Sequence, residues 1–167
     1  MRMIAAVDEN WGIGKDGKLL VSIPEDLARF RKITMGHTVV CGRKTLESFP
    51  GGKPLKNREN IVMTRNELYT IKGAKAVHSI PELLSLCAEI PGEEIFVIGG
   101  GTLYRSLLPY TDMCEITRID RRFEADTTFP NLDASGEWEI AERGEKQAYG
   151  DLTYRFLTYR RVFQPGS

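Results

Sequence analysis

The chain has 167 residues, of which 41% are hydrophobic and 28% charged, the balance of one globular domain. Its 23 Lys and Arg residues equal its 23 Asp and Glu residues, so it lacks the basic excess of proteins that bind nucleic acid or anionic membranes. The apolar runs are too short for a secretion signal or a membrane span, which favours a protein without a membrane partner.

Short strand-like runs alternate with helical patterns in the first half of the chain. Strands are predicted at 3–7, 38–41, 60–64 and 74–78. Ser22 and Glu25 have the spacing of a capping box, which predicts a helix that begins after Ser22 and ends at Gly36. A shorter helix is predicted after Gly42, and the turn residues 50–52 stop it.

The second half continues the alternation and then changes. Ser79 and Glu82 repeat the capping-box spacing, which predicts a helix to about Ile90. A buried strand at 94–98, a glycine triplet at 99–101, a short helix and a strand at 113–120 follow. The runs 138–143 and 152–163 are strand-like with no helix between them. Strand–helix alternation predicts an α/β domain with a mostly parallel sheet covered on both faces, and the last pair predicts an antiparallel addition at one edge.

Cysteines and histidines are few and scattered. Cys41, Cys87 and Cys114 are odd in number and far apart, which favours reduced thiols and a cytoplasmic protein. Such cysteines cannot build a zinc site with the two histidines, so no metal is expected. The segment 164–167 is predicted to be a disordered tail.

One glycine pattern imitates a dinucleotide-binding motif. Residues 12–17 match G-x-G-x-x-G, but no helical pattern begins at the third glycine and no Asp or Glu lies between Leu27 and Leu46, where the ribose-binding acid would stand. We therefore interpret this segment as a flexible glycine-rich loop, which after the first strand could still act as a lid over a site.

Three other segments are better candidates for binding phosphate. Gly99 to Thr102 place bare backbone between a buried strand and a helix start. Gly42 to Thr45 occupy a similar place and add two cations, and Thr64-Arg65 add a hydroxyl and a third cation at the end of the next strand. These strand ends meet at one edge of a parallel sheet. Three cations without a ribose-binding acid favour NADPH over NADH; the alternative for any one cation is ordinary surface charge.

Asp26 is a candidate functional acid in the first turn of the first predicted helix. One interpretation is simple complementation of the helix dipole. The other places Asp26 against Leu27 and Phe30 in an apolar pocket, where its pKa would be raised and its carboxylate could hold a cationic or amidine-like group of a ligand.

Taken together, these segments resemble dihydrofolate reductase in the family's order and spacing, over about residues 1–163. The matching stretches are Ile4-Ala5-Ala6, Ile13-Gly14, Ile23 to Leu27 with Phe30, Gly42 to Thr45 with Glu47-Ser48, Arg58 with Asn60-Ile61, Thr64, Ile98 to Gly101 with Tyr104, Thr117, and Asp126-Thr127 with Phe129-Pro130. The resemblance implies one domain with an eight-stranded, mostly parallel sheet that ends in an antiparallel strand. It also implies NADPH-dependent reduction of 7,8-dihydrofolate to tetrahydrofolate, with hydride transfer to C6 and protonation at N5, and antifolate inhibitors as further small-molecule partners.

The resemblance also implies the site residues. Asp26 would be the catalytic acid that binds the pterin 2-amino group and N3, supported by Thr117, and Arg58 would pair with the α-carboxylate of the glutamate tail. The other implied substrate contacts are Ile4, Ala5, Leu27, Phe30, Phe49, Leu55, Ile98 and Tyr104. The implied cofactor contacts are Ala6, Ile13, Gly14, Lys18, Leu19, Gly42, Arg43, Lys44, Thr45, Met63, Thr64, Arg65, His78, Ile98, Gly99, Gly100, Gly101, Thr102, Leu103 and Tyr104. The family's cis peptide falls at Gly99–Gly100, and residues 12–20 correspond to its mobile loop.

One stretch departs from the family pattern. Where the family usually has Pro-Trp before the Asp26 helix, this chain has Leu20-Val21, and valine cannot donate the bond of the missing indole N–H. The departure favours a second hypothesis, a non-catalytic NADPH-binding or sensor protein with a degraded pterin site. A third is the related pyrimidine reductase of riboflavin synthesis, which needs neither Asp26 nor Arg58. A monomer is expected, because no apolar stripe stands out beyond the predicted core faces.

Overall fold

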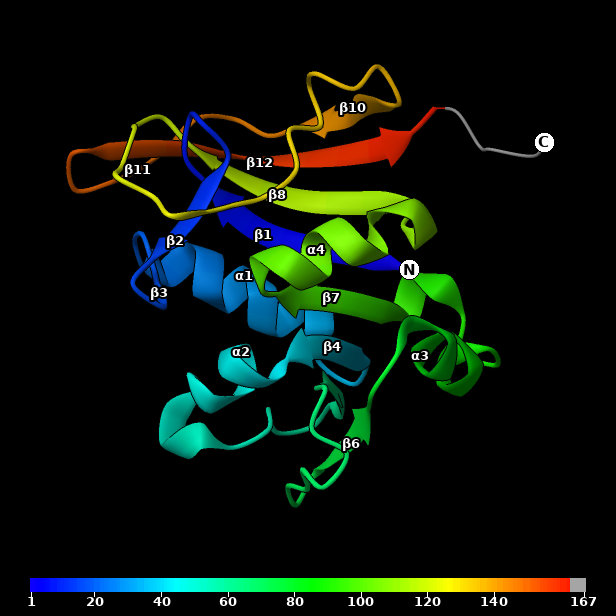
Figure 1. The fold of residues 1–167 in the computed structure, drawn as a ribbon. Coiled ribbons are helices and arrows are strands. Elements are labelled where there is room, and N and C mark those ends of the chain that lie inside the picture. The colour runs from blue at the N-terminus through cyan, green and yellow to red at the C-terminus, as the bar shows by residue number, and fades with distance from the viewer. Residues whose placement is uncertain (163–167) are drawn as a thin grey trace.

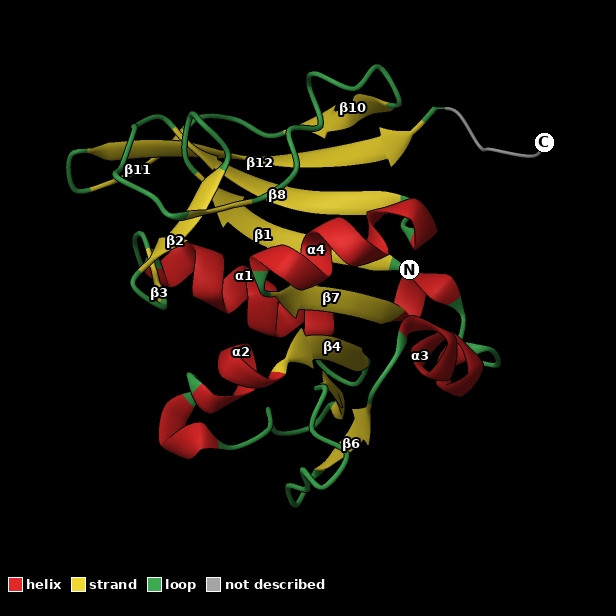
Figure 2. Cartoon of the chain, in the orientation of Figure 1, coloured by secondary structure: helices red, strands yellow, loops and turns green. Residues whose placement is uncertain are grey.

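A computed structural model gives the fold and describes residues 1–162. The predicted tail at 164–167 and the last residue of the predicted domain, Phe163, lie outside the described residues. Within the described part, no helix is long and apolar enough to cross a membrane. The fold is drawn in Figure 1 and, by type of secondary structure, in Figure 2.

The main sheet contains nine strands. They are β1 (Arg2–Val7), β4 (Thr38–Gly42), β5 (Glu59–Met63), β6 (Ala74–Val77), β7 (Ile95–Gly99), β8 (Met113–Ile119), β10 (Trp138–Arg143), β11 (Gln147–Tyr149) and β12 (Leu152–Arg161). Eight follow the order β10-β12-β8-β1-β7-β4-β5-β6, and the short β11 pairs with β12. The pairings from β8 to β6 are all parallel, whereas β12 is antiparallel to β8 and to β10. The predicted sheet is therefore confirmed, with β10 as the outermost strand beyond β12.

Helices cover both faces of this sheet, as predicted. They are α1 (Pro24–Thr34), α2 (Arg43–Glu47), α3 (Ile80–Cys87) and α4 (Gly101–Leu107), with the short 3-10 helices η1 (Pro50–Gly52), η2 (Gly92–Glu94) and η3 (Leu108–Tyr110). Successive side chains of a strand point to opposite faces of the sheet, so they pack against different helices. Met3 and Val7 pack with α3 and α4 in the main core, whereas Ile4 packs with α1 and Cys41 with α2. In Figure 1, α4 lies in front of the sheet and α1 behind it.

The two predicted capping boxes have different outcomes. Ser79 is the N-cap of α3, and its hydroxyl accepts a hydrogen bond from the backbone N–H of Glu82, which confirms the first half of that box. The prediction at Ser22 is wrong, because α1 begins one residue later, at an N-cap of Ile23 with no side-chain bond. Pro24 already has the backbone angle of a first helical residue, so α1 begins there without a capping side chain. The predicted helix to Ile90 ends earlier, at Cys87.

A second, small sheet was not predicted from the sequence. It consists of β2 (Gly12–Lys15), β3 (Lys18–Leu19) and β9 (Thr127–Thr128), with β2 in the centre. The glycine-rich segment expected to be a loop therefore forms a hairpin, whose turn at Asp16 and Gly17 has positive φ angles. No helix begins at Gly17, the third glycine of that pattern, which lies in the turn between β2 and β3, so the structure confirms that this segment is not a dinucleotide-binding motif. The hairpin and β9 lie side by side beyond the end of β1.

Candidate active site

The carboxyl ends of the parallel strands gather at one edge of the sheet, on the left in Figure 1. The starts of α1, α2 and α4 and the hairpin of β2 and β3 lie at this edge. Ligands of open α/β sheets bind outside these strand ends. The fold therefore brings the predicted acid, the glycine triplet and the predicted cations to the same side of the molecule.

Asp26 lies in the first turn of α1 and contacts β8. The Thr117 hydroxyl, from a side chain that is 2% exposed, donates a hydrogen bond of 2.5 Å to Asp26 Oδ1. Burial raises the pKa of the Asp26 carboxyl, while the bond from Thr117 and the charge of Arg29 act in the opposite direction. Asp26 is therefore easier to protonate than an exposed aspartate, which is what a proton-handling group near neutral pH requires.

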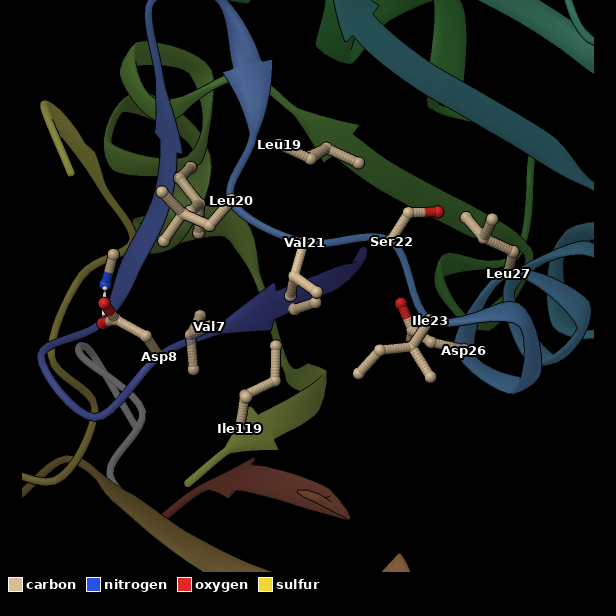
Figure 3. A pocket seen from close by; sticks show the side chains of 13 residues that line it. Val7, Asp8, Leu19, Leu20, Val21, Ser22, Ile23, Asp26, Leu27 and Ile119 are labelled. Carbon is tan, nitrogen blue, oxygen red and sulfur yellow. Dashed lines mark hydrogen bonds between the residues drawn. The ribbon is translucent and has the colours of Figure 1, made fainter. Parts of the chain in front are cut away.

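A pocket lies beside Asp26 and is drawn in Figure 3. Its walls come from the end of β1, the hairpin and the start of α1: Ala6, Val7, Asp8, Gly12, Ile13, Leu19, Leu20, Val21, Ser22, Ile23, Asp26, Leu27 and Ile119. Val21 packs with Ile23, Ile119 and Tyr154 in a small apolar cluster, so the departure from the family pattern leaves an apolar wall. Leu19 and Leu27 are 69% and 41% exposed, an arrangement that suits walls for a flat apolar ligand.

The glycine triplet packs closely against the start of α2. A Cβ atom at Gly99 would lie 3.3 Å from Thr45 Oγ1, and one at Gly101 would lie 2.6 Å from Thr127 Cγ2. Gly99 has a φ of 137°, and the Gly99–Gly100 peptide is cis, as the resemblance implied. The backbone here is bare because side chains do not fit, which suits the close approach of a pyrophosphate. The Tyr104 hydroxyl donates a 2.7 Å bond to the Ile4 carbonyl and so joins this segment to β1.

The predicted phosphate-binding cations differ in their surroundings. Lys44 and Arg65 are exposed and have no ion-pair partner within residues 1–162. Arg43, in contrast, lies 2.6 Å from the Glu47 carboxylate, and its guanidinium is 4.5 Å from the centre of the Tyr69 ring. Its charge is thus partly neutralised before any ligand binds, a pairing that the sequence analysis did not anticipate.

Thr64, Arg65 and His78 come together where β5 and β6 end. His78 Nδ1 is 2.9 Å from the Thr64 carbonyl oxygen, and the Thr64 hydroxyl accepts a bond from the backbone N–H of Asn66. Because a carbonyl only accepts, His78 Nδ1 carries the proton and Nε2 is left for another partner. The residues predicted to bind the dinucleotide thus fit a ligand with a pyrophosphate and a further phosphate.

Arg58 lies on the α1 side of the sheet, with its guanidinium 5.9 Å from the centre of the Phe30 ring. Its Nε atom is buried and has no hydrogen-bond partner in the described part of the chain. Burial and the nearby charge of Arg31 lower the pKa of Arg58. A guanidinium that is partly dehydrated and faces another cation favours an anionic ligand.

Asn60 holds the loop that carries Arg58, a role that the sequence analysis missed. This side chain is 4% exposed; it accepts a bond from the Leu55 N–H and donates to the carbonyl oxygens of Leu55 and Arg58. A buried polar residue at the start of an apolar strand was the only available signal.

The remaining predicted contacts fall into two groups. Ile4, Phe30, Leu55 and Ile98 meet in one cluster between α1 and the sheet, and Phe49 joins Ile98 in the next. The side chains of Ala5, Met63, Leu103 and Tyr104 pack into the main core. In this second group the side chains are largely taken up by packing in the core, which leaves the backbone for contact with a ligand.

Asp8 is a further residue that the sequence analysis missed. It is 1% exposed, and its carboxylate accepts bonds from the backbone N–H groups of Asn10, Gly12 and Phe123. Asp126 similarly accepts a bond from the Asp16 N–H at the tip of the hairpin. These two acids fasten the hairpin over the strand ends to the segment that follows β8.

Helices cover both faces of the α/β sheet, the edge of the sheet suits a dinucleotide, and a half-buried carboxylic acid lies beside that edge. This combination defines the class of the protein as a dinucleotide-dependent oxidoreductase. Comparisons with known proteins identify the particular family. The family described as dihydrofolate reductase matches residues 1–161. Dihydrofolate reductase of Bacillus subtilis (strain 168) is 43% identical over 160 residues, which cover 95% of this chain and 92% of the relative. That of Mycobacterium tuberculosis is 39% identical over 89% of this chain and 90% of the relative.

A solved structure agrees with these relatives. Dihydrofolate reductase from Enterococcus faecalis, complexed with NADP(H) and RAB-propyl, superimposes with a TM-score of 0.85 at 35% identity, over 97% of this chain and 96% of that one. The chain belongs to the dihydrofolate reductase family.

Proposed function

We propose that this protein catalyses the NADPH-dependent reduction of 7,8-dihydrofolate to 5,6,7,8-tetrahydrofolate, which supplies one-carbon metabolism. The observation that carries the proposal is the Asp26 carboxyl, hydrogen-bonded to Thr117 beside an apolar pocket, at the sheet edge that also holds the glycine triplet. Family membership over residues 1–161 supports the same reaction. The sensor hypothesis loses its main argument, because Asp26 and Thr117 retain a tightly bonded acid site despite the change at Val21.

Asp26 anchors the substrate ring and favours its protonation in this proposal. Its carboxylate would accept hydrogen bonds from the pterin 2-amino group and N3, and Thr117 keeps the carboxyl in that orientation. Burial raises the pKa of Asp26, so the carboxyl exchanges a proton more readily near neutral pH than an exposed aspartate does, and its ionised form stabilises positive charge on the bound pterin. The proton reaches N5 through water. The hairpin of β2 and β3, fastened by Asp8 and Asp126, keeps bulk solvent away from the reacting atoms.

NADPH would supply the hydride when bound. The residues that would hold it are the bare backbone of Gly99 to Gly101 with Thr45, and the group of Lys44, Thr64, Arg65 and His78 for its phosphates. Ile4, Leu27, Phe30, Phe49, Leu55 and Ile98 would form the walls for the substrate. The chain's contribution beyond Asp26 is to place two flat rings face to face.

The location and oligomeric state belong to the same proposal. We place the enzyme in the cytoplasm, which the three buried, unpaired cysteine thiols favour. We expect a monomer, because the most exposed apolar side chain of residues 1–162, Leu68 at 89%, stands between the exposed Glu67 and the partly buried Tyr69 rather than among other exposed apolar residues.

The direct test is the oxidation of NADPH by the purified protein, followed at 340 nm with and without dihydrofolate. Oxidation that requires dihydrofolate and yields tetrahydrofolate is expected. Tight NADPH binding without turnover would instead support the sensor hypothesis, and turnover of a pyrimidine substrate would support the riboflavin-pathway reductase.

Arg58 provides a prediction about the substrate tail. Arg58→Leu is expected to weaken dihydrofolate binding by roughly 1.5–3 kcal/mol, the range for a hydrogen bond to a charged group. Its guanidinium lies 5.9 Å from the centre of the ring of Phe30, one of the residues proposed as a wall for the substrate, so an anionic tail of that substrate is its proposed partner. Titration with methotrexate and with an antifolate that lacks a glutamate checks the prediction. Equal weakening of both inhibitors would contradict the assignment.

A further inference from the structure

The helix that carries Asp26 is attached to the sheet by three polar contacts within two turns. In the antiparallel register of β8 and β12, Ile119 lies opposite Tyr154, Thr117 opposite Phe156, and Glu115 opposite Thr158. Alternate residues of a strand share a face, so these six side chains form one patch. The contacts of Asp26 with Thr117, Arg29 with Glu115, and Glu25 with Tyr154 show that this patch faces α1.

Arg29 and Glu115 form the most buried ion pair of this patch. Arg29 Nη2 lies 3.0 Å from Glu115 Oε2, and Glu115 is 7% exposed. The Thr158 hydroxyl donates a second bond, of 2.9 Å, to the same carboxylate oxygen. The Arg29 guanidinium also lies 4.4 Å from the centre of the Phe156 ring. Its position is therefore determined by a carboxylate, a hydroxyl behind that carboxylate, and an aromatic ring.

This pair is adjacent to Asp26 on both elements. Residues 26 and 29 are three apart on a helix, which places their side chains about 5–6 Å apart at Cβ. Thr117, the partner of Asp26, and Glu115, the partner of Arg29, are two apart on β8 and share a face. A cation thus lies next to the acid, and an anion lies directly behind the cation.

We propose that Arg29 and Glu115 are positioning residues for Asp26: Glu115 holds the guanidinium beside the Asp26 carboxyl and offsets its charge, so the pair sets how readily Asp26 is protonated during turnover. The proposal rests on the reductase function proposed above and deepens it. The Glu25–Tyr154 bond, 2.6 Å long with Tyr154 1% exposed, holds the neighbouring residue of the same turn.

The other ionisable groups around Asp26 are few. They are Glu25 on α1, Tyr154 on β12, Tyr104 on α4, Asp8 at the end of β1, and Arg2 on β1, which lies 4.0 Å from Glu115. The hydroxyls of both tyrosines are bonded as donors, and burial raises the pKa of Tyr154 to about 12. Both tyrosines therefore remain neutral between pH 5 and 9. Arg29 and Glu115 form the charged pair next to Asp26, and a single substitution changes the net charge of that pair.

The test compares four variants: Glu115→Gln, Arg29→Met, the double variant, and Arg29→Lys. Hydride transfer at saturating NADPH and dihydrofolate, measured from pH 5 to 9, reports the apparent pKa. Glu115→Gln leaves the positive charge of Arg29 without its counter-charge, which favours the Asp26 carboxylate and lowers the apparent pKa. Arg29→Met removes the positive charge next to Asp26, while Glu115 keeps its weaker contact with Arg2, and so raises the apparent pKa. Each shift is expected to be about 0.5 to 1 unit, as Coulomb's law gives for a charge roughly 7 Å away at an effective dielectric constant of about 40 to 80.

The double variant removes both charges, so its apparent pKa is expected to return to that of the unchanged protein, and Arg29→Lys is expected to preserve it. Glu139→Gln is the matched control, because Glu139 forms an exposed ion pair with Arg160 between the outermost strands β10 and β12 and has no contact with α1 among the described ion pairs. A purely structural role would lower the melting temperature without opposite shifts. If Glu115→Gln does not fold, the contrast between Arg29→Met and Arg29→Lys carries the same test. Single variants with unchanged or equally directed shifts would overturn the proposal.

A second measurement separates this proposal from the proposed function. The titration of the Asp26 side-chain carbon, followed by 13C NMR in the ligand-free protein, is expected to show the same opposite shifts. If the unchanged protein failed to reduce dihydrofolate, the reductase assignment would fall, while this titration would still test the pair. Normal turnover with an Asp26 titration that neither single variant moves would overturn the pair alone.

Discussion

Asp26→Asn is expected to reduce turnover at pH 7 by about 10²- to 10⁴-fold, the range for loss of a positioned proton-handling group. The amide keeps the size of the side chain and can still accept the bond from Thr117, so the pocket is retained. It cannot carry a negative charge, so it gives up the stabilisation of a protonated pterin. NADPH affinity is expected to stay within about twofold, because the residues proposed to hold the cofactor lie on α2, on α4 and at the ends of β5, β6 and β7 rather than on α1.

The pH dependence gives this prediction a direction. Burial raises the pKa of Asp26, and in the unchanged protein turnover is expected to fall as the pH rises through the pKa of the site, because the active form holds one proton that the Asp26 carboxyl and the bound pterin share. The asparagine variant is expected to lose that limb of the profile. Stopped-flow measurement of hydride transfer from pH 5 to 9 checks both points. Asp151→Asn, on an exposed turn, is the matched control. Turnover at pH 7 that matched the unchanged protein would remove Asp26 from the mechanism.

The same substitution makes a prediction about stability. The folded-state pKa of Asp26 lies above its unfolded value, so the ionised carboxylate costs stability at pH values above the folded pKa, and the cost disappears below the unfolded pKa. Asp26→Asn is therefore expected to raise the free energy of unfolding at pH 7 and to leave it unchanged near pH 3. Urea denaturation at the two pH values measures this difference. A loss of activity together with a gain in stability would show that Asp26 serves catalysis at the expense of stability.

Much of the fold was predictable because the parallel strands are buried on both faces. Residues 39–41 and 95–98 within the predicted strands are apolar throughout and are followed by glycine, a pattern typical of strands in a parallel sheet. The small sheet was not predictable, because β2 is Gly-Ile-Gly-Lys and its pairing depends on Asp8 and Asp126. Contacts of that kind join residues that are far apart in the sequence and leave no local period.

The site was predictable to a different extent. Asp26 and the glycine triplet stand out locally, as an extra acid at a helix start and as bare backbone after a buried strand. Glu115 does not, because it stands in an apolar run and its partner Arg29 is 86 positions away. The wrong prediction of an N-cap at Ser22 has the same cause, a contact with a residue far away in the sequence. Its spacing with Glu25 was right, but Glu25 is bonded instead by Tyr154, from a strand near the end of the chain.

Gly99→Ala is expected to weaken NADPH binding by at least about tenfold and to cost about 1–3 kcal/mol of stability. At a φ of 137° an alanine is strained, and its Cβ would meet Thr45 at 3.3 Å. Relief of the backbone strain and of the close contact with Thr45 requires the backbone after β7 to move. That backbone includes the bare peptide surface proposed for the pyrophosphate, and Tyr104, which anchors it to Ile4. Binding and folding therefore suffer together.

Gly136→Ala is the control that separates these two effects. Gly136 also has a positive φ, of 71°, but nothing lies within 4 Å of an added Cβ, and it stands just before β10, which three strands of the sheet separate from β7. It is expected to lose stability by a similar mechanism while NADPH affinity stays unchanged. Fluorescence titration with NADPH and urea denaturation of both variants measure the two quantities. If Gly99→Ala lost stability but bound NADPH as tightly as Gly136→Ala does, the glycine triplet would be a folding requirement alone, and the cofactor's phosphates would have to lie elsewhere on the edge.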